Sequence, residues 1–298
     1  MRPRRIPRTS VIIQLIVLAF ALLVALNIQT VLDDYALLTF HPSPQVAAIE
    51  AQLDLTPEAK AIFYRSKPQI DDKSSFNKDC ETKPQELELG CYYQGRIYVL
   101  EISNASLAPE MEVVMAHELL HAAWARMSQS EHQTLGVQVE QVYRQLDDPS
   151  LQQRMAGYAK SEPGEQDNEL HSILGTEYGG LPASLEQHYA IYFTDRQAIV
   201  EAHAAYKAIF DNQLTELNTD YNQIESEKSQ LSTLDSQLQT YRSEDAISLY
   251  NSLVPRQNSM VDDINTRIAE YNQLKDAYNA LAESLSSQQV TNTATSAQ

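Results

Sequence analysis

The chain has 298 residues, of which 22 are Lys or Arg and 40 are Asp or Glu, so its net charge is −18. A nucleic-acid backbone is bound by clustered basic side chains, and none of these clusters follows residue 10, so the composition excludes nucleic acid as a partner. Two cysteines are too few for a disulfide scaffold or a Cys-only zinc site, so any metal must be held mainly by His and carboxylate side chains.

The N-terminal region combines a basic start with an apolar run. Four arginines lie within residues 1–10, and residues 11–32 are interrupted by few polar side chains. A run of this length can cross the roughly 30 Å hydrocarbon core of a bilayer as a helix. The next basic residue is Lys60, so the charge bias predicts a cytoplasmic basic tail, a transmembrane signal anchor over residues 11–32, and the rest of the chain on the far side. A cleaved signal peptide is the alternative, because residues 19–21 fit a small-x-small cleavage site.

Two short helices are predicted after a linker over residues 33–44. They span residues 44–53 and 57–66, and each begins with a proline, which the first turn of a helix accepts. Thr56 is a suitable N-cap for the second helix. Both helices are expected to lead into the main domain.

Residues 87–102 contain two runs rich in β-branched and aromatic side chains around residues 94–95, which predicts a β-hairpin. A helix is predicted directly afterwards, over residues 109–127. Cys80 and Cys91 flank the entry to the hairpin, and export would favour a disulfide between them. Closing this short loop would stabilise the fold by about 3 kcal/mol. Two buried thiols in a reducing compartment are the alternative.

The glycines divide the rest of the chain. All eight lie between Gly90 and Gly180, so a turn-rich middle region is predicted to precede a helical C-terminal third. Two apolar stripes at heptad spacing, with a break at Pro255, predict an antiparallel helical hairpin, or coiled coil, over residues 196–285. This hairpin would be a spacer, a self-association stalk or an arm that binds a partner protein. Residues 286–298 have no apolar periodicity and are predicted to be disordered.

One motif carries chemistry: residues 117–121 are His-Glu-Leu-Leu-His, an HExxH sequence. On a helix, His117 and His121 project from one face, so both imidazoles can bind one metal ion, and Glu118 can reach a water molecule beside it. This spacing favours tetrahedral zinc. The alternative is that the three side chains lie on an ordinary amphipathic helix, but the preceding hairpin and the uncharged, proline-free flanks favour a metal site.

With this motif after a hairpin, the chain resembles the zincin metallopeptidases, and its layout is similar to that of small membrane-anchored bacterial zincin-like proteins of unassigned substrate. The resemblance covers about residues 90–127. It implies an α+β catalytic domain over residues 45–195, in which a small antiparallel sheet lies beside the active-site helix and its edge strand binds extended substrate. The metzincin branch is excluded, because it requires Gly and His where this chain has Trp124 and Met127.

A catalytic zinc site needs a third protein ligand and a position for water. Residues 168–172 (Asn-Glu-Leu-His-Ser) resemble the NExxSD helix of the thermolysin-like gluzincins, which implies that Glu169 is the third ligand. Ile173 stands where that family has the Asp that orients a zinc-bound His, so another residue must supply this contact. His171 is the alternative third ligand, and Glu177 is a weaker candidate.

Peptide hydrolysis also requires hydrogen-bond donors for the oxyanion that develops on the carbonyl. Tyr178, His188 and Tyr189 are weak candidates, because tyrosine occurs 16 times here and more often packs in a core. Trp124, the single tryptophan, is expected to anchor the active-site helix to the core.

Together these features predict a single-pass membrane protein whose extracytoplasmic domain is a zinc metallopeptidase that cleaves exported or cell-surface proteins. His117, His121 and Glu169 are expected to bind Zn²⁺, while Glu118 removes a proton from water and delivers it to the leaving amine. The alternative is a non-catalytic surface protein that combines a structural or degenerate zincin-like domain with a partner-binding coiled coil.

Overall fold

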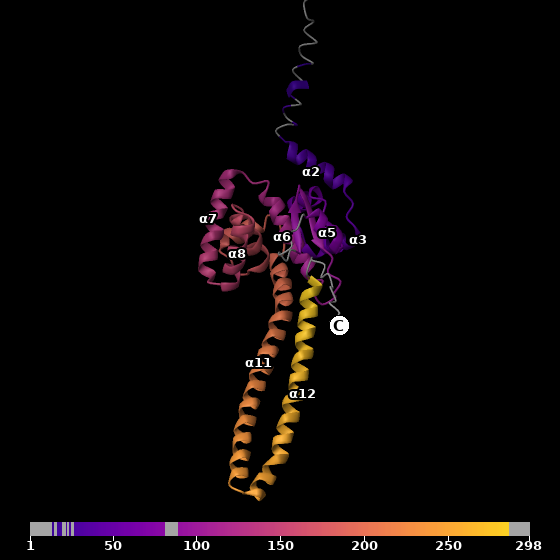
Figure 1. Ribbon diagram of the computed structural model, residues 1–298. Coiled ribbons are helices and arrows are strands. Elements are labelled where there is room, and N and C mark those ends of the chain that lie inside the picture. The colour runs from indigo at the N-terminus through magenta and orange to yellow at the C-terminus, as the bar shows by residue number, and fades with distance from the viewer. Residues whose placement is uncertain are drawn as a thin grey trace, which may run out of the picture. The chain divides into compact units, whose positions relative to one another are not determined.

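The computed structural model describes residues 14, 17–19, 22, 24, 27–80 and 89–285. They divide into two compact units (Figure 1): the first holds residues up to 101 and 109–203, and the second holds 102–108 and 204–286. The predicted basic tail over residues 1–10 and the predicted disordered tail over residues 286–298 lie outside the described residues.

The first unit is built mainly from helices. Its first helices are α2 (Ile28–Thr39), α3 (Pro44–Leu53), α4 (Pro57–Arg65) and α5 (Lys73–Asp79). Its strands are β1 (Gln69–Asp71), β2 (Gly90–Tyr93) and β3 (Arg96–Leu100). The later helices are α6 (Glu110–Trp124), α7 (Gln129–Leu146), α8 (Pro149–Ser161), α9 (Gln166–Glu177) and α10 (Ala183–Tyr189).

The expected α+β class is wrong, because helices predominate and the sheet consists of three strands of three, four and five residues. The sheet is also mixed. The β2–β3 hairpin is confirmed as antiparallel, with Cys91 opposite Tyr98, but β1 joins the other side of β3 in parallel. The sequence Gln-Ile-Asp of β1 is too short to show the alternation that reveals a strand.

Close helix packing explains why the middle region differs from the turn-rich expectation. Gly136 and Gly175 lie inside α7 and α9. A Cβ at Gly175 would lie 2.4 Å from Leu120 Cδ1 and 2.7 Å from Tyr189 Cε1, and one at Gly136 would lie 2.4 Å from a carboxylate oxygen of Asp167. These glycines therefore allow neighbouring elements to approach, and they do not mark turns.

The two predicted lead-in helices are confirmed as α3 and α4. The Ser43 hydroxyl accepts a hydrogen bond from the Val46 amide, and the Thr56 hydroxyl accepts one from the Ala59 amide. Each cap satisfies one of the backbone donors that the start of a helix leaves unpaired.

Helix α2 overlaps the region that was expected to cross a membrane. Among the described residues, no helix is long and apolar enough for this, which contradicts the signal anchor over residues 11–32 and the single-pass, extracytoplasmic topology derived from it. Much of that range lies outside the described residues. Helix α2 packs against α4, and Asp33 within it accepts two hydrogen bonds from the Arg126 guanidinium, at 2.8 and 2.9 Å. This ion pair ties the helix to the first unit.

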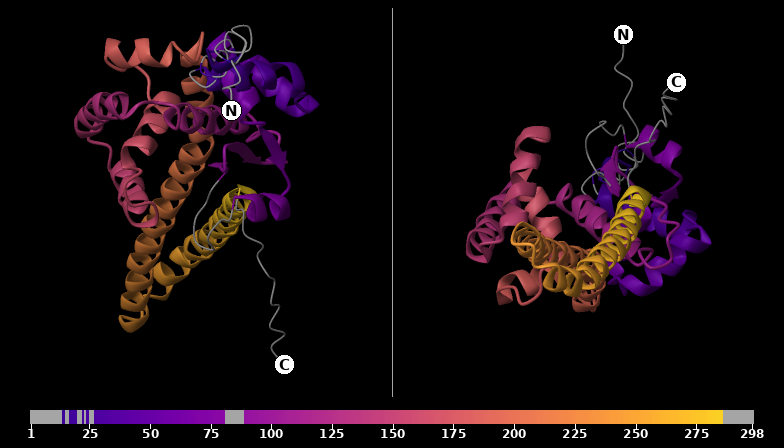
Figure 2. Two further views of the ribbon diagram at one scale, coloured as in Figure 1. Left: turned by 90° about the horizontal axis from the view of Figure 1, so that it is seen from above. Right: turned by 60° about the horizontal axis from the view of Figure 1, so that its bottom comes forward.

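Helix α6 is the centre of the first unit. It packs against β2, β3, α3 and α4 on one side and against α9 on the other. Figure 1 shows α7 and α8 on one side of α6 and α3 and α5 on the other, and the view from above in Figure 2 shows the same separation. The helix is buried along most of its length, and Met115, Leu119 and Leu120 are wholly enclosed. Enclosing an apolar side chain of this size stabilises a fold by about 1.5–3 kcal/mol. The expected anchoring by Trp124 is confirmed by its packing against this core.

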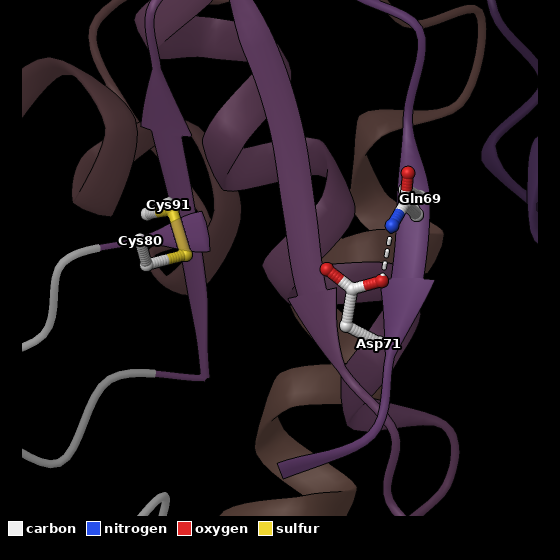
Figure 3. Close-up of a disulfide and its surroundings, with 4 residues drawn as sticks. All are labelled: Gln69, Asp71, Cys80 and Cys91. Atoms are coloured by element: carbon white, nitrogen blue, oxygen red, sulfur yellow. Dashed lines mark hydrogen bonds between the residues drawn. A yellow bond between two sulfur atoms is a disulfide. The ribbon is translucent and has the colours of Figure 1, made fainter. Parts of the chain in front are cut away.

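The predicted disulfide between Cys80 and Cys91 is confirmed (Figure 3). It joins the residue after α5 to β2, the strand at one edge of the sheet. At the opposite edge, Gln69 and Asp71 of β1 are linked by a hydrogen bond between their side chains (Figure 3). The disulfide therefore fastens the outer strand that lies nearest to α6.

Two long helices account for most of the second unit. Helix α11 (Arg196–Ser243) begins in the first unit, and α12 (Ile247–Leu285) follows a bend where Asp245 has a φ of 56°. The predicted antiparallel pair is confirmed by contacts that run in opposite directions along the two helices: Phe210 with Tyr278, Tyr221 with Tyr271, and Glu227 with Arg267. The expected break at Pro255 is wrong, because this proline lies inside α12, which tolerates the loss of one backbone donor.

Candidate metal centre

Helix α6 presents the two motif histidines on one face, as the sequence predicts. The rings of His117 and His121 have centroids 4.7 Å apart and are inclined by 75°. Both side chains are largely buried, with exposed fractions of 16% and 10%. Their Nε2 atoms point toward the first turn of α9, which packs closely against α6.

Helix α9 places Glu169 opposite these rings. Its carboxylate oxygens lie 3.8 Å from His117 Nε2 and 3.4 Å from His121 Nε2, and the three potential ligand atoms lie within 4.8 Å of one another. Two ligand atoms of a tetrahedral zinc ion, each about 2.0–2.2 Å from the metal, lie about 3.3–3.5 Å apart. Burial acts to raise the pKa of Glu169, but His121, His117 and Arg154 together outweigh it, so this pKa is lowered. The spacing and the mixed nitrogen and oxygen donors fit zinc.

Hydrogen bonds fix how His121 presents its ring. Asn168 donates from Nδ2 to Glu165 Oε2 at 3.1 Å, so its amide oxygen must be the atom 2.9 Å from His121 Nδ1. The Nδ1 atom therefore donates, and in the neutral ring Nε2 directs its lone pair toward the Glu169 carboxylate. Two electron-rich groups face each other favourably only when a proton or a cation lies between them.

The orienting contact that Ile173 cannot make is thus supplied by Asn168. Ser172 assists it, with its hydroxyl 3.3 Å from His121 Nδ1. Neither role was assigned from the sequence, although Asn168 belongs to the segment that resembles the gluzincin helix. An amide and a hydroxyl can replace a carboxylate here, because the imidazole needs only an acceptor at Nδ1.

Glu118 follows His117 on α6, lines the same cavity as the three candidate ligands and is only 5% exposed. The backbone of β2 approaches it closely: a Cβ at Gly90 would lie 2.7 Å from Glu118 Oε1 and 2.4 Å from Val114 Cγ1. Glycine at this position leaves room for the carboxylate. The strand and the HExxH helix therefore fit together only with a residue that lacks a side chain at position 90.

These residues line a cleft of about 350 Å³. Its walls come from β2, from the histidine face of α6, and from the adjoining ends of α8 and α9. The disulfide forms part of the wall on the β2 side. The cleft is large enough to admit one or a few side chains of a substrate together with the bond that reacts.

Tyr158 of α8 also lines the cleft and was not singled out in the sequence. Burial raises the pKa of its hydroxyl, and the negative charges of Glu169 and Glu118 raise it further. The hydroxyl therefore stays protonated at neutral pH and keeps a proton to donate. Leu151 and Met155, which are buried, precede it at helical spacing, and this pattern is the signal that could have placed Tyr158 on an inward face.

The alternative third ligands lie elsewhere. His171 is fully buried, and its Nε2 atom lies 2.9 Å from His188 Nε2, away from the triad. Glu177 forms an ion pair with Arg154 at 2.6 Å. Of the three candidates, Glu169 alone is brought to the two motif histidines.

The expected oxyanion donors also make other contacts. The Tyr178 hydroxyl donates to Asp148 Oδ2 at 2.8 Å, and the Tyr189 hydroxyl donates to the His171 carbonyl at 2.7 Å. His188 pairs with His171. Three tyrosines line the cleft, Tyr92, Tyr93 and Tyr158, and Tyr158 is the one whose pKa, raised by burial, is raised further by both Glu169 and Glu118.

The cleft thus combines two histidines and a glutamate whose donor atoms could hold a metal ion, a neighbouring carboxylate and a protonated tyrosine. No family model matches this chain, and no curated protein or solved structure matches it either. Its function must therefore be inferred from the chemistry of these side chains.

Proposed function

We propose that this protein is a zinc-dependent peptidase whose active site is the cleft between α6, α9 and β2. The observation that carries the proposal is the convergence of His117, His121 and Glu169 within 4.8 Å beside the buried carboxylate of Glu118. Two imidazoles and one carboxylate form a donor set that is typical of catalytic zinc and leaves one coordination position open. The resemblance of the HExxH helix to that of the zincins supports the same activity.

The roles follow from the chemistry of each side chain. Zinc, when bound, supplies a Lewis acid that polarises a carbonyl group and makes water more acidic. His117, His121 and Glu169 hold the ion. Glu118 accepts a proton from water in the cleft and delivers it to the leaving amine, and the Tyr158 hydroxyl donates a hydrogen bond to the carbonyl oxygen as negative charge develops.

The position of β2 favours a peptide as the substrate. The strand lies at an edge of the sheet and lines the cleft. An extended chain can add to such an edge through backbone hydrogen bonds, which would bring its peptide bonds past the histidine face of α6.

The test combines metal analysis with hydrolysis. The purified chain should bind about one zinc per molecule, and it should cleave members of a peptide library in a reaction that a chelator stops and added zinc restores. Glu112→Gln is a matched control for Glu118→Gln, because Glu112 lies on the same helix outside the cleft. Lack of zinc binding, or cleavage that the chelator leaves unchanged, would contradict the proposal and favour a non-catalytic protein.

A further inference from the structure

Asn168 can orient His121 only while its own amide is held in one orientation. The oxygen and nitrogen of an amide exchange places when the group turns over, so the same side chain can present an acceptor or a donor. A metal-bound His121 uses Nε2 for the metal and keeps its proton on Nδ1, which needs an acceptor. The useful orientation is therefore the one in which Asn168 Oδ1 lies 2.9 Å from His121 Nδ1.

Glu165 lies where it distinguishes the two orientations. Its Oε2 atom lies 3.1 Å from Asn168 Nδ2. A carboxylate accepts hydrogen bonds and donates none, so it attracts the amide nitrogen and repels the amide oxygen. If the amide turned over, its oxygen would face the Glu165 carboxylate, and its NH₂ group would face the Nδ1 proton of His121. Both contacts would then be unfavourable.

The hydroxyl of Ser172 cannot make this distinction. It lies 3.3 Å from His121 Nδ1, but a hydroxyl can rotate to accept or to donate. Within the described part of the chain, the Asn168 side chain has its nitrogen on Glu165 and its oxygen on His121. The contact with Glu165 therefore determines which atom of the amide faces the histidine.

The backbone holds Glu165 in this place. The residue precedes α9, and its carbonyl oxygen accepts a hydrogen bond from the Glu169 amide at 2.9 Å, which links it to the turn that carries the third candidate ligand. A side chain at this position commonly caps the helix, but that of Glu165 does not. Its carboxylate binds the Asn168 side chain instead, so removing the carboxylate leaves the backbone hydrogen bonds of α9 intact.

We propose that Glu165 is a positioning residue of the metal centre: it fixes the Asn168 amide so that the amide oxygen accepts the Nδ1 proton of His121 and Nε2 is left to bind the metal. This inference rests on the zinc site of the proposed function and adds a residue that acts on that site through two others. Hydrogen bonds in such a chain polarise one another, so the carboxylate also strengthens the bond between Asn168 and His121.

Zinc affinity tests this role without any hydrolysis. The full chain, freed of metal, competes for zinc with a chromophoric chelator of known affinity. Glu165→Ala should weaken zinc binding by about tenfold, at the lower end of the effect of losing a partner of a metal ligand. Glu165→Gln should keep most of the affinity, because its amide oxygen can still accept from Asn168 Nδ2.

Glu140→Ala is the matched control for these variants, since Glu140 is an exposed glutamate of α7 outside the cleft. It should bind zinc as the parent chain does. An unchanged affinity in Glu165→Ala would overturn the inference. Equal losses in Glu165→Ala and Glu165→Gln would also overturn it, because they would assign the effect to charge and not to the hydrogen bond.

Asn168→Asp separates the orientation of the amide from any general effect of Glu165. An aspartate can accept from His121 Nδ1 with either oxygen, so no orientation is left for Glu165 to select. In the Asn168→Asp chain, the further change Glu165→Ala should therefore leave the zinc affinity within about twofold, which is the usual scatter of such a cycle. A loss in this chain as large as in the parent would contradict the inference.

A spectroscopic measurement reports on the amide in the metal-free chain. Isotope-labelled asparagine gives side-chain NH₂ signals in nuclear magnetic resonance spectra, and the Asn168 signal is identified by its absence in Asn168→Asp. Glu165→Ala should shift this signal, because the NH₂ group loses a hydrogen bond to a carboxylate, and Glu140→Ala should not. A signal that Glu165→Ala leaves in place would overturn the inference.

These outcomes keep the inference separate from the proposed function. Inactivity of a chain that binds zinc would contradict the peptidase proposal alone. Zinc binding that does not depend on Glu165 would contradict this inference alone. A parent chain that binds no zinc would contradict both.

Discussion

Two clusters of histidine and glutamate connect α6 with α9, and they differ in how their polar atoms face one another. In the metal centre, two histidines turn toward one carboxylate, that of Glu169. In the second cluster, one histidine lies between two carboxylates: His203 Nδ1 is 3.3 Å from Glu110 Oε1, and its Nε2 is 3.4 Å from Glu177 Oε2. Arg154 pairs with Glu177 at 2.6 Å in addition.

The difference shows why one cluster suits a metal and the other does not. Each nitrogen of His203 has its own acceptor, so protons on the ring fill both gaps. In the metal centre the Nε2 atoms of His117 and His121 instead converge on the single carboxylate of Glu169, so one metal ion can contact all three groups. The residue types are the same in both clusters, and the direction of the donor atoms determines what they bind.

Removing a metal ligand should have the largest effect. We expect His121→Ala to lose zinc and activity together, since two remaining ligands hold the ion poorly. His203→Ala, its counterpart in the second cluster, should keep about one zinc per chain. Metal analysis of both proteins after gel filtration tests the comparison, and equal zinc content in the two variants would contradict it. Glu169→Ala against His171→Ala tests the third ligand in the same way.

Glu118→Gln should keep the metal and abolish most turnover. The amide has nearly the same shape as the carboxylate but cannot accept a proton, and loss of a general base lowers a rate by about 10²–10⁴-fold. Zinc content and kcat are measured on the same preparation. The peptidase proposal would be falsified if this variant cleaved a chelator-sensitive substrate at the parent rate.

Tyr158→Phe should lower kcat by about 10²-fold, the effect of losing one donor to a developing oxyanion. Metal content and KM should change little, because the hydroxyl acts mainly in the transition state. Tyr178→Phe is the control, since that hydroxyl binds Asp148. A similar loss of kcat in both variants would point to a structural effect and against the role of Tyr158.

Gly90→Ala should lower kcat by roughly tenfold, because an added Cβ displaces the Glu118 carboxylate, and small misplacements of reacting groups slow catalysis. Zinc should remain bound, since the three ligands are untouched. Gly95→Ala, at the hairpin turn with nothing close to its Cβ position, tests for a general effect on the hairpin. An unchanged kcat in Gly90→Ala would contradict this prediction, because it would show that the Glu118 carboxylate can move without slowing catalysis.

The smallest expected effect is a pH dependence of stability from the second cluster. Burial acts to lower the pKa of His203, but Glu110 and Glu177 outweigh both burial and Arg154, so this pKa is raised. The imidazolium contribution to the free energy of unfolding is therefore complete below about pH 6.5 and is lost as the pH rises through the raised folded-state value.

Urea unfolding of the parent and of His203→Gln at several pH values measures this contribution. At acidic pH the parent should be more stable by on the order of 1–3 kcal/mol, the usual result of leaving a buried acceptor without its donor. The difference should shrink as the pH increases. A constant difference across the range would mean that His203 contributes by packing and not by charge.

The parts of the site that the sequence could predict depend on local spacing. His117 and His121 are one helical turn apart, so their convergence follows from the helix alone. Glu169 was reached through its resemblance to a known helix. Helical spacing could place Tyr158 on an inward face of α8, but its place in the cleft depends on how α8 packs against α9 and α9 against α6.

The errors also have physical causes. The glycine content of the middle region predicts turns, whereas Gly136 and Gly175 permit close packing within helices. The apolar composition of residues 11–32 suggested a membrane span, whereas the part described as α2 extends through Asp33 to pair with Arg126. Pro255 was expected to end a helix that continues through it. In each case, contacts with distant residues or the length of the helix had more influence than the structure that the local sequence favours.

The disulfide has a practical consequence for work with this protein. Cys80 and Cys91 form part of the cleft wall, and their bond is attached to β2, the strand that approaches Glu118. A thiol reductant added to a purification buffer would act on this bond and would also compete for zinc as a ligand. Inactivity in such a buffer could result from reduction of the disulfide or from loss of zinc. The protein should therefore be purified and assayed without thiols before a lack of activity is interpreted.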